Sequence, residues 1–334
     1  MFFGQTVFIL LVLQFLLLPL CAFSACQPEE KCVHITSCRF LLRKTYGTSS
    51  HLGYLLRIKP CGYREAHFVC CQVLPKSCGE LPPTSRTNAF PWTVKLLYQD
   101  LWDQVKPYTQ RCTGSLINKR YVVTAAHCIN LGRFILKMVR LGEHKISTDK
   151  DCVNNLCAPP YLDVHIEEKI IHEDYDSNSP HNDIALLRLV NHVDYSNAIK
   201  PICILPSSDI RNHFFINETM IVAGWGVTPT KTSRDVLRWT IVKGRKCKQP
   251  FRNSTLCALS MDGTDSTRSD SGGPLMARMG NPVNESVYLA GITLLGGGNY
   301  HSGSYGIIGS AYTRTEYFIN WIKEKLIPSS QDEF

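Results

Sequence analysis

Apolar and polar residues alternate in short runs from residue 90 toward the C-terminus, and Gly, Pro and Asn interrupt these runs. Clear examples are residues 92–96, 121–124 and 220–226. Alternation with a period of two is typical of strands that bury one face, and frequent turn residues keep the strands short. The pattern therefore predicts an all-β domain, built as a barrel or a sandwich.

The two ends of the chain differ from this pattern. Residues 7–20 form a long apolar run before the small residues of Ala22-Phe23-Ser24. Such a run is typical of a secretory signal peptide and predicts that residues 1–25 are removed, although a positive charge before the run is missing. A membrane anchor is the alternative, and the run is rather short for one. Near the other end, residues 317–326 have the apolar spacing of an amphipathic helix.

Cysteine usage indicates a second, smaller domain. One of the 15 cysteines, Cys21, lies in the signal segment, and the others form an even set, as a disulfide framework requires. The segment from Cys26 to Cys71 holds six of them and is too short to bury a secure core without cross-links. Six cysteines allow about 15 pairings, so spacing alone leaves the connectivity open. Zinc is the competing explanation, but no Cys-x-x-Cys pair is matched by a second His or Cys pair.

Three short motifs in the β-rich part carry the candidate chemistry. In chain order they place His127 in Thr-Ala-Ala-His-Cys, Asp183 in Asn-Asp-Ile-Ala-Leu and Ser271 in Asp-Ser-Gly-Gly-Pro. A serine hydroxyl becomes a good nucleophile when an imidazole takes its proton, and the imidazole needs a carboxylate that fixes its tautomer. We therefore predict Ser271 as nucleophile, His127 as general base and Asp183 as the group that orients the imidazole.

These motifs resemble those of the chymotrypsin family of serine proteases, and the match extends to Phe90-Pro91-Trp92 and Tyr312-Thr313-Arg314. The N-terminal cysteine pattern, which ends in Cys70-Cys71, resembles the clip domain of arthropod haemolymph proteases. The resemblance implies an all-β fold of two six-stranded β-barrels with a C-terminal helix, preceded by a disulfide-rich clip domain. The expected parts are a signal peptide (1–25), a clip domain (26–71), a linker with a vestigial activation segment (72–89) and a chymotrypsin-like protease domain (90–330).

The resemblance also implies a pairing for every cysteine after the signal segment. Three bridges would lie in the clip domain, one would tether the linker to the protease domain, and three would lie within the protease domain. The pairs are Cys26–Cys70, Cys32–Cys61, Cys38–Cys71, Cys78–Cys203, Cys112–Cys128, Cys152–Cys157 and Cys247–Cys257.

The substrate pocket is assigned by the same resemblance. Asp265 stands where trypsin-like members place the carboxylate at the pocket base, which implies pairing with Arg or Lys of a substrate. Arg268 would lie at the rim, and Ser310 replaces a glycine that keeps the pocket open. Two alternatives stay open: Asp265 is a solvated loop residue, or Arg268 neutralises it.

Several positions depart from the family in ways that bear on activity. In the family, a cut frees an Ile-Val-Gly-Gly-like N-terminus, whose ammonium pairs with the aspartate just before the nucleophile. No such segment lies between Gly79 and Phe90, so Asp270 is expected to lack this partner. The oxyanion hole would be formed by the N–H groups of Ser269 and Ser271, and Ser269 replaces a glycine. Thr267 replaces a cysteine of the bridge that braces the pocket. The family has a Ser-Trp pair whose serine supports the triad aspartate and whose tryptophan lines the substrate cleft. Leu294-Leu295 replaces this pair.

Charge and modification motifs narrow the remaining possibilities. The net charge of +8 is spread without a basic block, so nucleic acid binding is not indicated. Three sequons, at Asn217, Asn253 and Asn284, are compatible with glycosylation in the secretory pathway. We expect no cofactor; the alternative is calcium at Glu143 and Asp151, in a loop that resembles the calcium loop of some relatives but carries the cation Lys145.

Together these features predict a secreted, extracellular clip-domain serine endopeptidase with preference for Arg or Lys, acting in a haemolymph, immune or developmental cascade. Its partners would be protein substrates or other cascade proteases, with serpin inhibitors, and neither nucleic acid nor membrane. The alternative function is that of a catalytically impaired serine protease homologue, which acts as a binding or cofactor module in such a cascade.

Overall fold

The structure is a computed structural model that describes residues 26–38, 61, 68–81, 89–153, 156–204, 215–226, 235–247, 251, 253–261, 271–281, 285–295 and 309–327. Contacts divide the chain into two units, whose main parts are Met1–Gln72 and Val73–Ile327. Each unit is described separately below. None of the helices in the described ranges is long and apolar enough to cross a membrane.

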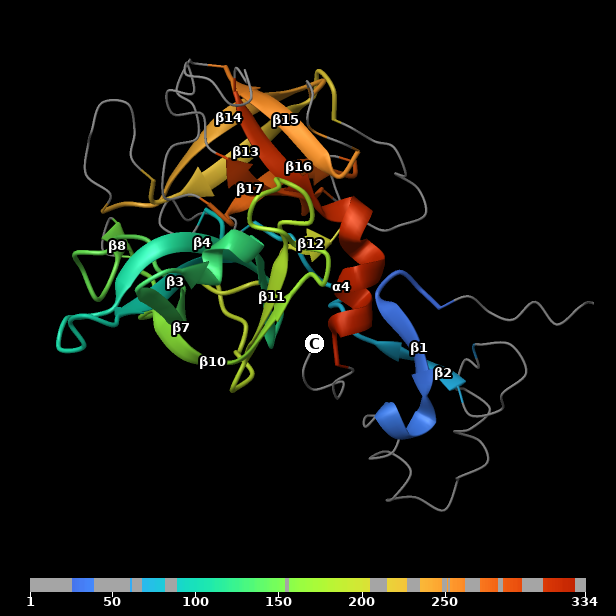
Figure 1. The fold of residues 1–334 in the computed structure, drawn as a ribbon, viewed down its shortest axis with the longest axis horizontal. Helices are drawn as coiled ribbons and strands as arrows, with labels where there is room; N and C mark the ends of the chain where they lie inside the picture. Colours follow the sequence, from blue (N-terminus) through green and yellow to red (C-terminus); the bar gives the residue numbers. More distant parts are fainter. Residues whose placement is uncertain are drawn as a thin grey trace, which may run out of the picture. The chain divides into compact units, whose positions relative to one another are not determined.

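The first unit is a small disulfide-linked hairpin. Strand β1 (Glu30–His34) pairs antiparallel with β2 (Phe68–Gln72), which places Cys32 opposite Cys70, and a 3-10 turn, η1 (Ile35–Ser37), follows β1 (Figure 1). Three bridges join this unit: Cys26–Cys70, Cys32–Cys61 and Cys38–Cys71. They are the pairs that the clip resemblance implied. Apart from these cysteines, the buried apolar cluster contains only Val33 and Val69 among the described residues, so the cross-links carry much of the order.

The second unit begins with a closed antiparallel barrel. Its sheet order is β10-β11-β5-β4-β3-β7-β6, and a further pairing of β10 with β7 closes it. The strands are β3 (Thr93–Asp100), β4 (Thr109–Asn118), β5 (Tyr121–Thr124), β6 (Asn130–Leu131), β7 (Phe134–Leu141), β10 (Leu162–Ile171) and β11 (Ala185–Leu189). Residues 93–96 and 121–124 are therefore in strands, as predicted, but each of these residues is buried, so the strands bury both faces here.

A second closed barrel follows. Its order is β12-β17-β16-β13-β14-β15-β18, with β17 also paired to β18. The strands are β12 (Cys203–Ile204), β13 (Thr219–Gly224), β14 (Arg238–Arg245), β15 (Thr255–Ser260), β16 (Pro274–Met279), β17 (Ser286–Leu295) and β18 (Ser310–Arg314). Because short β6 and β12 only extend the sheets, each barrel has six principal strands. The prediction of an all-β, two-barrel fold is confirmed (Figure 1).

Few other elements complete this unit. A 3-10 turn, η2 (Ala126–Cys128), follows β5, and a short hairpin of β8 (Cys152–Val153) and β9 (Leu156–Cys157) is closed by Cys152–Cys157. The helix expected over 317–326 is observed as α4 (Ile319–Lys325), preceded by the 3-10 turn η3 (Thr315–Phe318). It buries Ile319 and Ile322, as its apolar spacing predicted.

Candidate active site

His127 lies on a turn that two contacts anchor to the first barrel. The turn η2 follows β5 directly, and the bridge Cys112–Cys128 ties it to β4. From β3, the buried hydroxyl of Tyr98 donates a hydrogen bond of 2.7 Å to the Cys128 carbonyl. These two contacts fix Cys128, the residue next to His127, and so hold the imidazole in place, as a general base requires.

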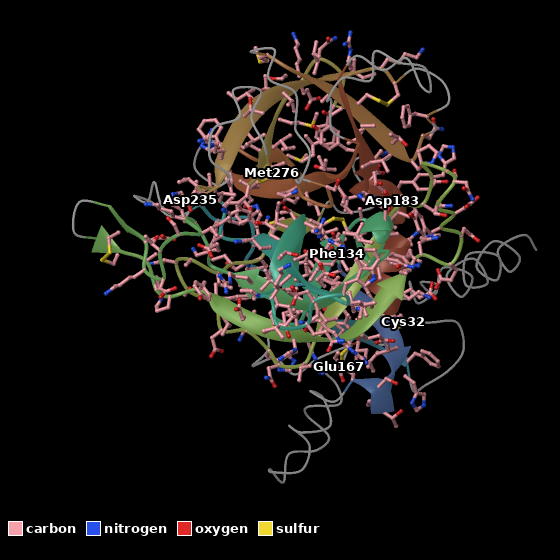
Figure 2. The ribbon with its side chains drawn as sticks, turned by 60° about the vertical axis from the view of Figure 1, so that its left-hand side comes forward. Cys32, Phe134, Glu167, Asp183, Asp235 and Met276 are labelled. Carbon is pink, nitrogen blue, oxygen red and sulfur yellow. A yellow bond between two sulfur atoms is a disulfide. The ribbon has the colours of Figure 1, made fainter. Side chains whose placement is uncertain are left out.

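Asp183 reaches His127 through strand pairing. Ala185, the first residue of β11, lies opposite Thr124, the last residue of β5, so the residues that flank these strand ends meet. Just before Asp183, Asn182 adopts a φ of +57°, a conformation that Asn tolerates better than most residues. The resulting turn places Asp183 near the seam of the two barrels (Figure 2).

The His127–Asp183 pair has the geometry of a catalytic dyad. Asp183 Oδ2 lies 2.6 Å from His127 Nδ1, and Oδ1 accepts a 2.8 Å hydrogen bond from the His127 backbone N–H. Because the carboxylate faces Nδ1, that nitrogen carries the proton and Nε2 is left as the acceptor. The Asp183 side chain is 3% exposed and that of His127 is 30% exposed, so the imidazole keeps one side accessible.

Ser271 sits where the second barrel meets the first. Its carbonyl accepts a 2.9 Å hydrogen bond from the Thr113 backbone N–H and lies 3.6 Å from Cys128 Sγ. Gly272 follows with a φ of +78°, and a Cβ there would collide with Thr124 Oγ1 and the Thr113 carbonyl. This close approach brings Ser271, the predicted nucleophile, to the turn that carries His127. The hydroxyl makes no hydrogen bond to the imidazole, a bond that commonly tightens only in a substrate complex.

One further positioning residue was not singled out for a role from the sequence. Thr313 on β18 donates its hydroxyl to the Asp183 carbonyl at 2.9 Å, although the two residues are far apart in the chain. The signal was present, because Thr313 lies in the Tyr-Thr-Arg motif that supported the resemblance. Its role depends on a contact between barrels, which a single motif cannot reveal.

Comparison with known proteins identifies the family. A model of the family described as Trypsin matches residues 83–322. The Spaetzle-processing enzyme of Drosophila melanogaster is 33% identical, with 92% of each chain covered, and the CLIP domain-containing serine protease HP8 of Bombyx mori is 32% identical, with 90% of this chain and 92% of that protein covered. The chain belongs to the clip-domain serine proteases.

A solved structure agrees with this assignment. The crystal structure of the Drosophila Grass clip serine protease of the Toll pathway matches with a TM-score of 0.64 and 29% sequence identity, covering 88% of this chain and 93% of that chain. Family membership therefore extends to the N-terminal disulfide-rich unit as well as to the two barrels.

Several predicted site residues lie outside the described residues. These are the pocket residues Asp265 and Arg268, the oxyanion residue Ser269, its neighbour Asp270 and the sequon residue Asn284. Their roles stay predictions. Within the described part, Asn217 and Asn253 are exposed, and Ser310 is buried at the start of β18, opposite Ala258.

The cysteines of the protease unit are joined as the resemblance implied. The structure contains the bridges Cys78–Cys203, Cys112–Cys128, Cys152–Cys157 and Cys247–Cys257. The first of these ties the segment after the clip domain to β12. With the three bridges of the first unit, every cysteine after Cys21 has a partner.

Leu294 stands where the resemblance implies a serine that supports the triad aspartate. Leu294 is buried in a cluster with Phe251, Cys257 and Ala311 and offers no polar atom. Among the described residues, only His127 donates hydrogen bonds to the Asp183 carboxylate. The carboxylate therefore depends on His127 for its orientation as much as His127 depends on it.

The residues expected for calcium do not fit that ion. Glu143 Oε2 lies 3.8 Å from Lys95 Nζ and 3.2 Å from Arg140 Nη1, so two cations already neutralise this buried carboxylate. Asp151 Oδ2 accepts hydrogen bonds from the backbone N–H groups of His144 and Lys145. Calcium needs roughly six to eight oxygen ligands. Burial lowers the pKa of Lys95 to about 8 and raises that of Glu143, and the attraction between the two opposes both shifts.

Proposed function

We propose that this protein is a secreted endopeptidase of an extracellular cascade, with preference for Arg or Lys and a low intrinsic rate. The observation that carries the proposal is the His127–Asp183 pair, which has the contacts that a general base requires. The relatives support a protein substrate, since one is named for processing Spaetzle. Other cascade proteases and serpin-type inhibitors are the further partners expected at the site formed by His127, Asp183 and Ser271.

The proposed reaction uses the triad in the usual roles. The Ser271 hydroxyl attacks the peptide carbonyl while His127 Nε2 takes its proton, and Asp183 stabilises the imidazolium that forms. His127 then gives the proton to the leaving amine. A low rate is expected from the sequence, because the Cβ of Ser269 disfavours the backbone conformation in which the family's glycine directs its N–H to the oxyanion. Losing such a donor altogether typically costs about 2.7–4 kcal/mol of transition-state stabilisation, and a misaligned donor loses part of that amount.

A second function, that of a protease homologue without catalysis, is favoured by the apolar Leu294 and by the short segment before Phe90. Leu294 leaves the Asp183 carboxylate with no side-chain hydroxyl donor among the described residues. The segment holds no apolar sequence that could insert beside Asp270 after a cut at Arg86. In this case the chain would act by binding partners of the cascade.

Active-site labelling separates the two functions. The purified, secreted protein is treated with a fluorophosphonate probe, before and after exposure to trypsin, with Ser271→Ala as the control. We expect slow labelling that disappears in Ser271→Ala, because the nucleophile and base are present but the oxyanion hole is compromised. A complete lack of labelling would assign the chain to the homologues, and rapid stoichiometric labelling would contradict the low rate.

The proposed specificity has its own test. If Asp265 lies accessible at the base of the pocket, benzamidine should bind with a dissociation constant in the millimolar range or below, and Asp265→Ser should abolish the binding. Isothermal titration calorimetry measures this without any need for turnover. Lack of binding to the wild type would mean that Arg268 or Ser310 closes the pocket, and would contradict the Arg or Lys preference.

A further inference from the structure

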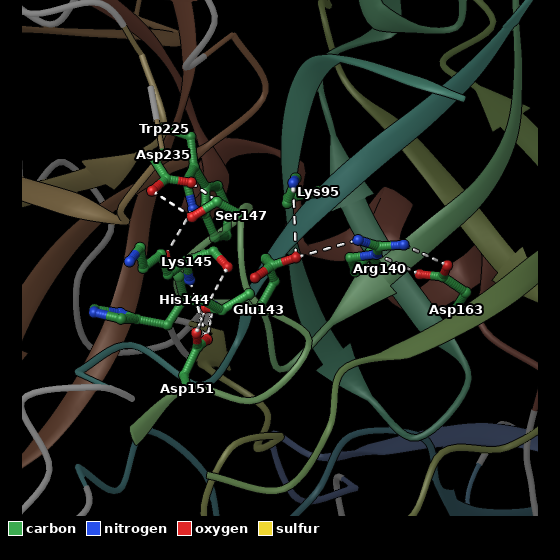
Figure 3. A network of polar contacts seen from close by, with 11 residues as sticks. Lys95, Arg140, Glu143, His144, Lys145, Ser147, Asp151, Asp163, Trp225 and Asp235 are labelled. Atoms are coloured by element: carbon green, nitrogen blue, oxygen red, sulfur yellow. Dashed lines mark hydrogen bonds and ion pairs between the residues drawn. The ribbon is translucent and has the colours of Figure 1, made fainter. Parts of the chain in front are cut away.

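The loop that follows β7 is held by a cluster of four charged side chains from the first barrel, two of them buried and two partly exposed (Figure 3). Lys95 on β3 is 2% exposed, and Glu143, just after β7, is 5% exposed. Glu143 Oε2 contacts both Lys95 Nζ and Arg140 Nη1. Arg140 in turn binds Asp163 on β10 through Nε and Nη2, at 2.7 and 2.8 Å. Two cations and two carboxylates thus balance within the cluster.

The far end of the same loop is closed by hydrogen bonds to Asp151. Asp151 Oδ2 accepts the backbone N–H groups of His144, at 3.1 Å, and Lys145, at 3.0 Å, while Oδ1 accepts the Thr148 hydroxyl at 2.6 Å. A loop folded around a metal would point oxygens at the ion, whereas this loop points donors at the carboxylate. Of the four carboxylate oxygens of Glu143 and Asp151, only Glu143 Oε1 lacks a hydrogen-bond partner or ion-pair contact in the described structure.

The closed loop is also the place where the first barrel contacts a segment of the second. The Ser147 backbone N–H and hydroxyl both donate to Asp235, at 2.7 and 2.8 Å. The His144 carbonyl accepts hydrogen bonds from Trp225 Nε1, at 3.2 Å, and from the Leu237 backbone N–H, at 2.8 Å. Anything that keeps the loop in this conformation therefore also keeps the two barrels joined at this point.

Lys95 connects the two sets of contacts. Its side chain enters the cluster from β3, and its ammonium lies 5.6 Å from the centre of the Trp225 ring, within the range of a cation–π attraction. A buried ammonium without a carboxylate, or a buried carboxylate without a cation, is costly, so each depends on the other. The positive charge that Lys95 places against Glu143 belongs to a side chain of the polypeptide, whereas a bound metal ion can leave its site.

We propose that the Lys95 ammonium serves as the internal cation of the 143–151 loop, so that the loop closes on the second barrel without any divalent metal. The protein gains a metal-independent contact between its barrels, at the cost of the metal site. A corollary is that removing Lys95 leaves Arg140 as the single cation beside Glu143 and Asp163, gives the cluster a net negative charge, and so creates affinity for a divalent cation.

The test is calcium titration of the secreted full-length protein. Thermal unfolding is measured in EDTA and in about 5 mM CaCl2, and calcium binding is measured by calorimetry. We expect the wild type to unfold at the same temperature in both buffers and to bind no calcium. Lys95→Ser should unfold at a lower temperature in EDTA and recover part of the loss in CaCl2, with a dissociation constant of about 1 mM or below.

Two control variants keep the result specific. Lys243→Ser removes an exposed lysine on β14 and should change neither stability nor the response to calcium. Lys95→Arg retains the charge and should stay indifferent to calcium. Calcium binding that stabilises the wild type would overturn the proposal, and so would a folded Lys95→Ser protein that gains no response. If Lys95→Ser is not secreted, the wild-type titration still decides.

Discussion

At the scale of single residues, the candidate site depends on the Asp183 carboxylate, which bonds to His127, and on Gly272, which has no Cβ. Both oxygens of the Asp183 carboxylate bond to His127, one to its side chain and one to its backbone. Ser271 depends on Gly272 in the same way, because only a residue without a Cβ allows the turn to lie against Thr113 and Thr124. Contacts of this kind tolerate little change, because packing in such places leaves no room for an extra carbon.

Gly272 provides a direct test at this scale. Gly272→Ala combines a positive φ with a collision against the backbone of β4, so we expect a loss of stability above the roughly 1–2 kcal/mol of a left-handed alanine, together with a loss of fluorophosphonate labelling. Gly132→Ala is a matched control, since Gly132 has a φ of +64° and an added methyl group there would meet no atom within 4 Å. Gly132→Ala should lose only the stability that a left-handed alanine costs, and its rate of fluorophosphonate labelling should equal that of the wild type. Equal losses in the two variants would show that the close approach at Gly272 is unimportant.

At the scale of elements, we predict that the short segment before Phe90 and the residues just before Ser271 affect the same oxyanion hole. In the family that the chain resembles, a cut frees an apolar N-terminus, and its ammonium pairs with the aspartate just before the nucleophile. Asp270 occupies that position here. We expect the segment between Gly79 and Phe90 to be too short and too polar for this role, and the Cβ of Ser269 to disfavour the backbone conformation of the family's glycine. The two departures act on the same oxyanion hole, so their effects should not add independently.

A repair experiment tests this coupling. An Arg-Ile-Val-Gly-Gly segment of family length inserted before Phe90, followed by trypsin cleavage, should give little labelling by itself, and Ser269→Gly should also give little. The combination should increase the labelling rate by roughly 100-fold or more, as expected for a restored oxyanion donor. The measurement is the rate of fluorophosphonate reaction, with Ser271→Ala in the repaired background as the control. A full gain from either repair alone would refute the coupling.

At the scale of the whole protease unit, the C-terminal helix supports the segment that carries Asp183. The His172 ring lies 5.3 Å from that of Phe318 and 5.1 Å from that of Trp321, and the His172 backbone N–H bonds to the Ile184 carbonyl at 3.2 Å. Next to it, Glu173 accepts a 2.7 Å hydrogen bond from Trp321 Nε1 and pairs with Lys325. The segment of η3 and α4 therefore contacts His172 and Glu173, and His172 is in turn bonded to Ile184, the neighbour of Asp183.

The pH dependence of stability reports on this support. The hydrogen bond from Lys325, assisted by Trp321, lowers the pKa of Glu173 from its ordinary 4.5 to about 2. Because the folded-state pKa is the lower one, the unfolded chain binds the proton first, and the contribution is present above pH 4.5 and lost as the pH falls toward 2. We expect the wild type to be more stable than Glu173→Gln at pH 6 and the difference to shrink at pH 3.

Urea unfolding at the two pH values measures this difference. Glu324→Gln is the matched control, because Glu324 on α4 also contacts Lys325, at 3.7 Å, but its side chain is 70% exposed. It should differ less from the wild type at either pH than Glu173→Gln does at pH 6. A pH-independent difference between the wild type and Glu173→Gln would show that the charge of Glu173 plays no part in holding α4. The contribution itself is expected to be small, since the pair is close to solvent.

The fold class and the family could be predicted from the sequence, and the roles of the triad residues stay predictions. The alternation of runs such as 121–124 depends only on neighbours along the chain, and the strand β5 occupies the same residues. Motifs around His127, Asp183 and Ser271 identify reactive groups because the flanking residues serve the same chemistry wherever it occurs. The cysteine pairs followed from the resemblance, and the structure contains the same pairs.

The tertiary structure alone decided which distant groups meet. Glu143 and Asp151 carried the type and spacing of calcium ligands, but Lys95, far away on β3, is brought against Glu143 by the pairing of β3 with β7. The hydroxyl of Thr313 reaches Asp183 for the same reason, through the packing of β18 against the first barrel. Barrel closure and strand register set these contacts, and they are sums of many weak interactions that no short motif contains. The sequence by itself therefore determined what chemistry this protein carries, and its folding decided which charges and hydroxyls control that chemistry.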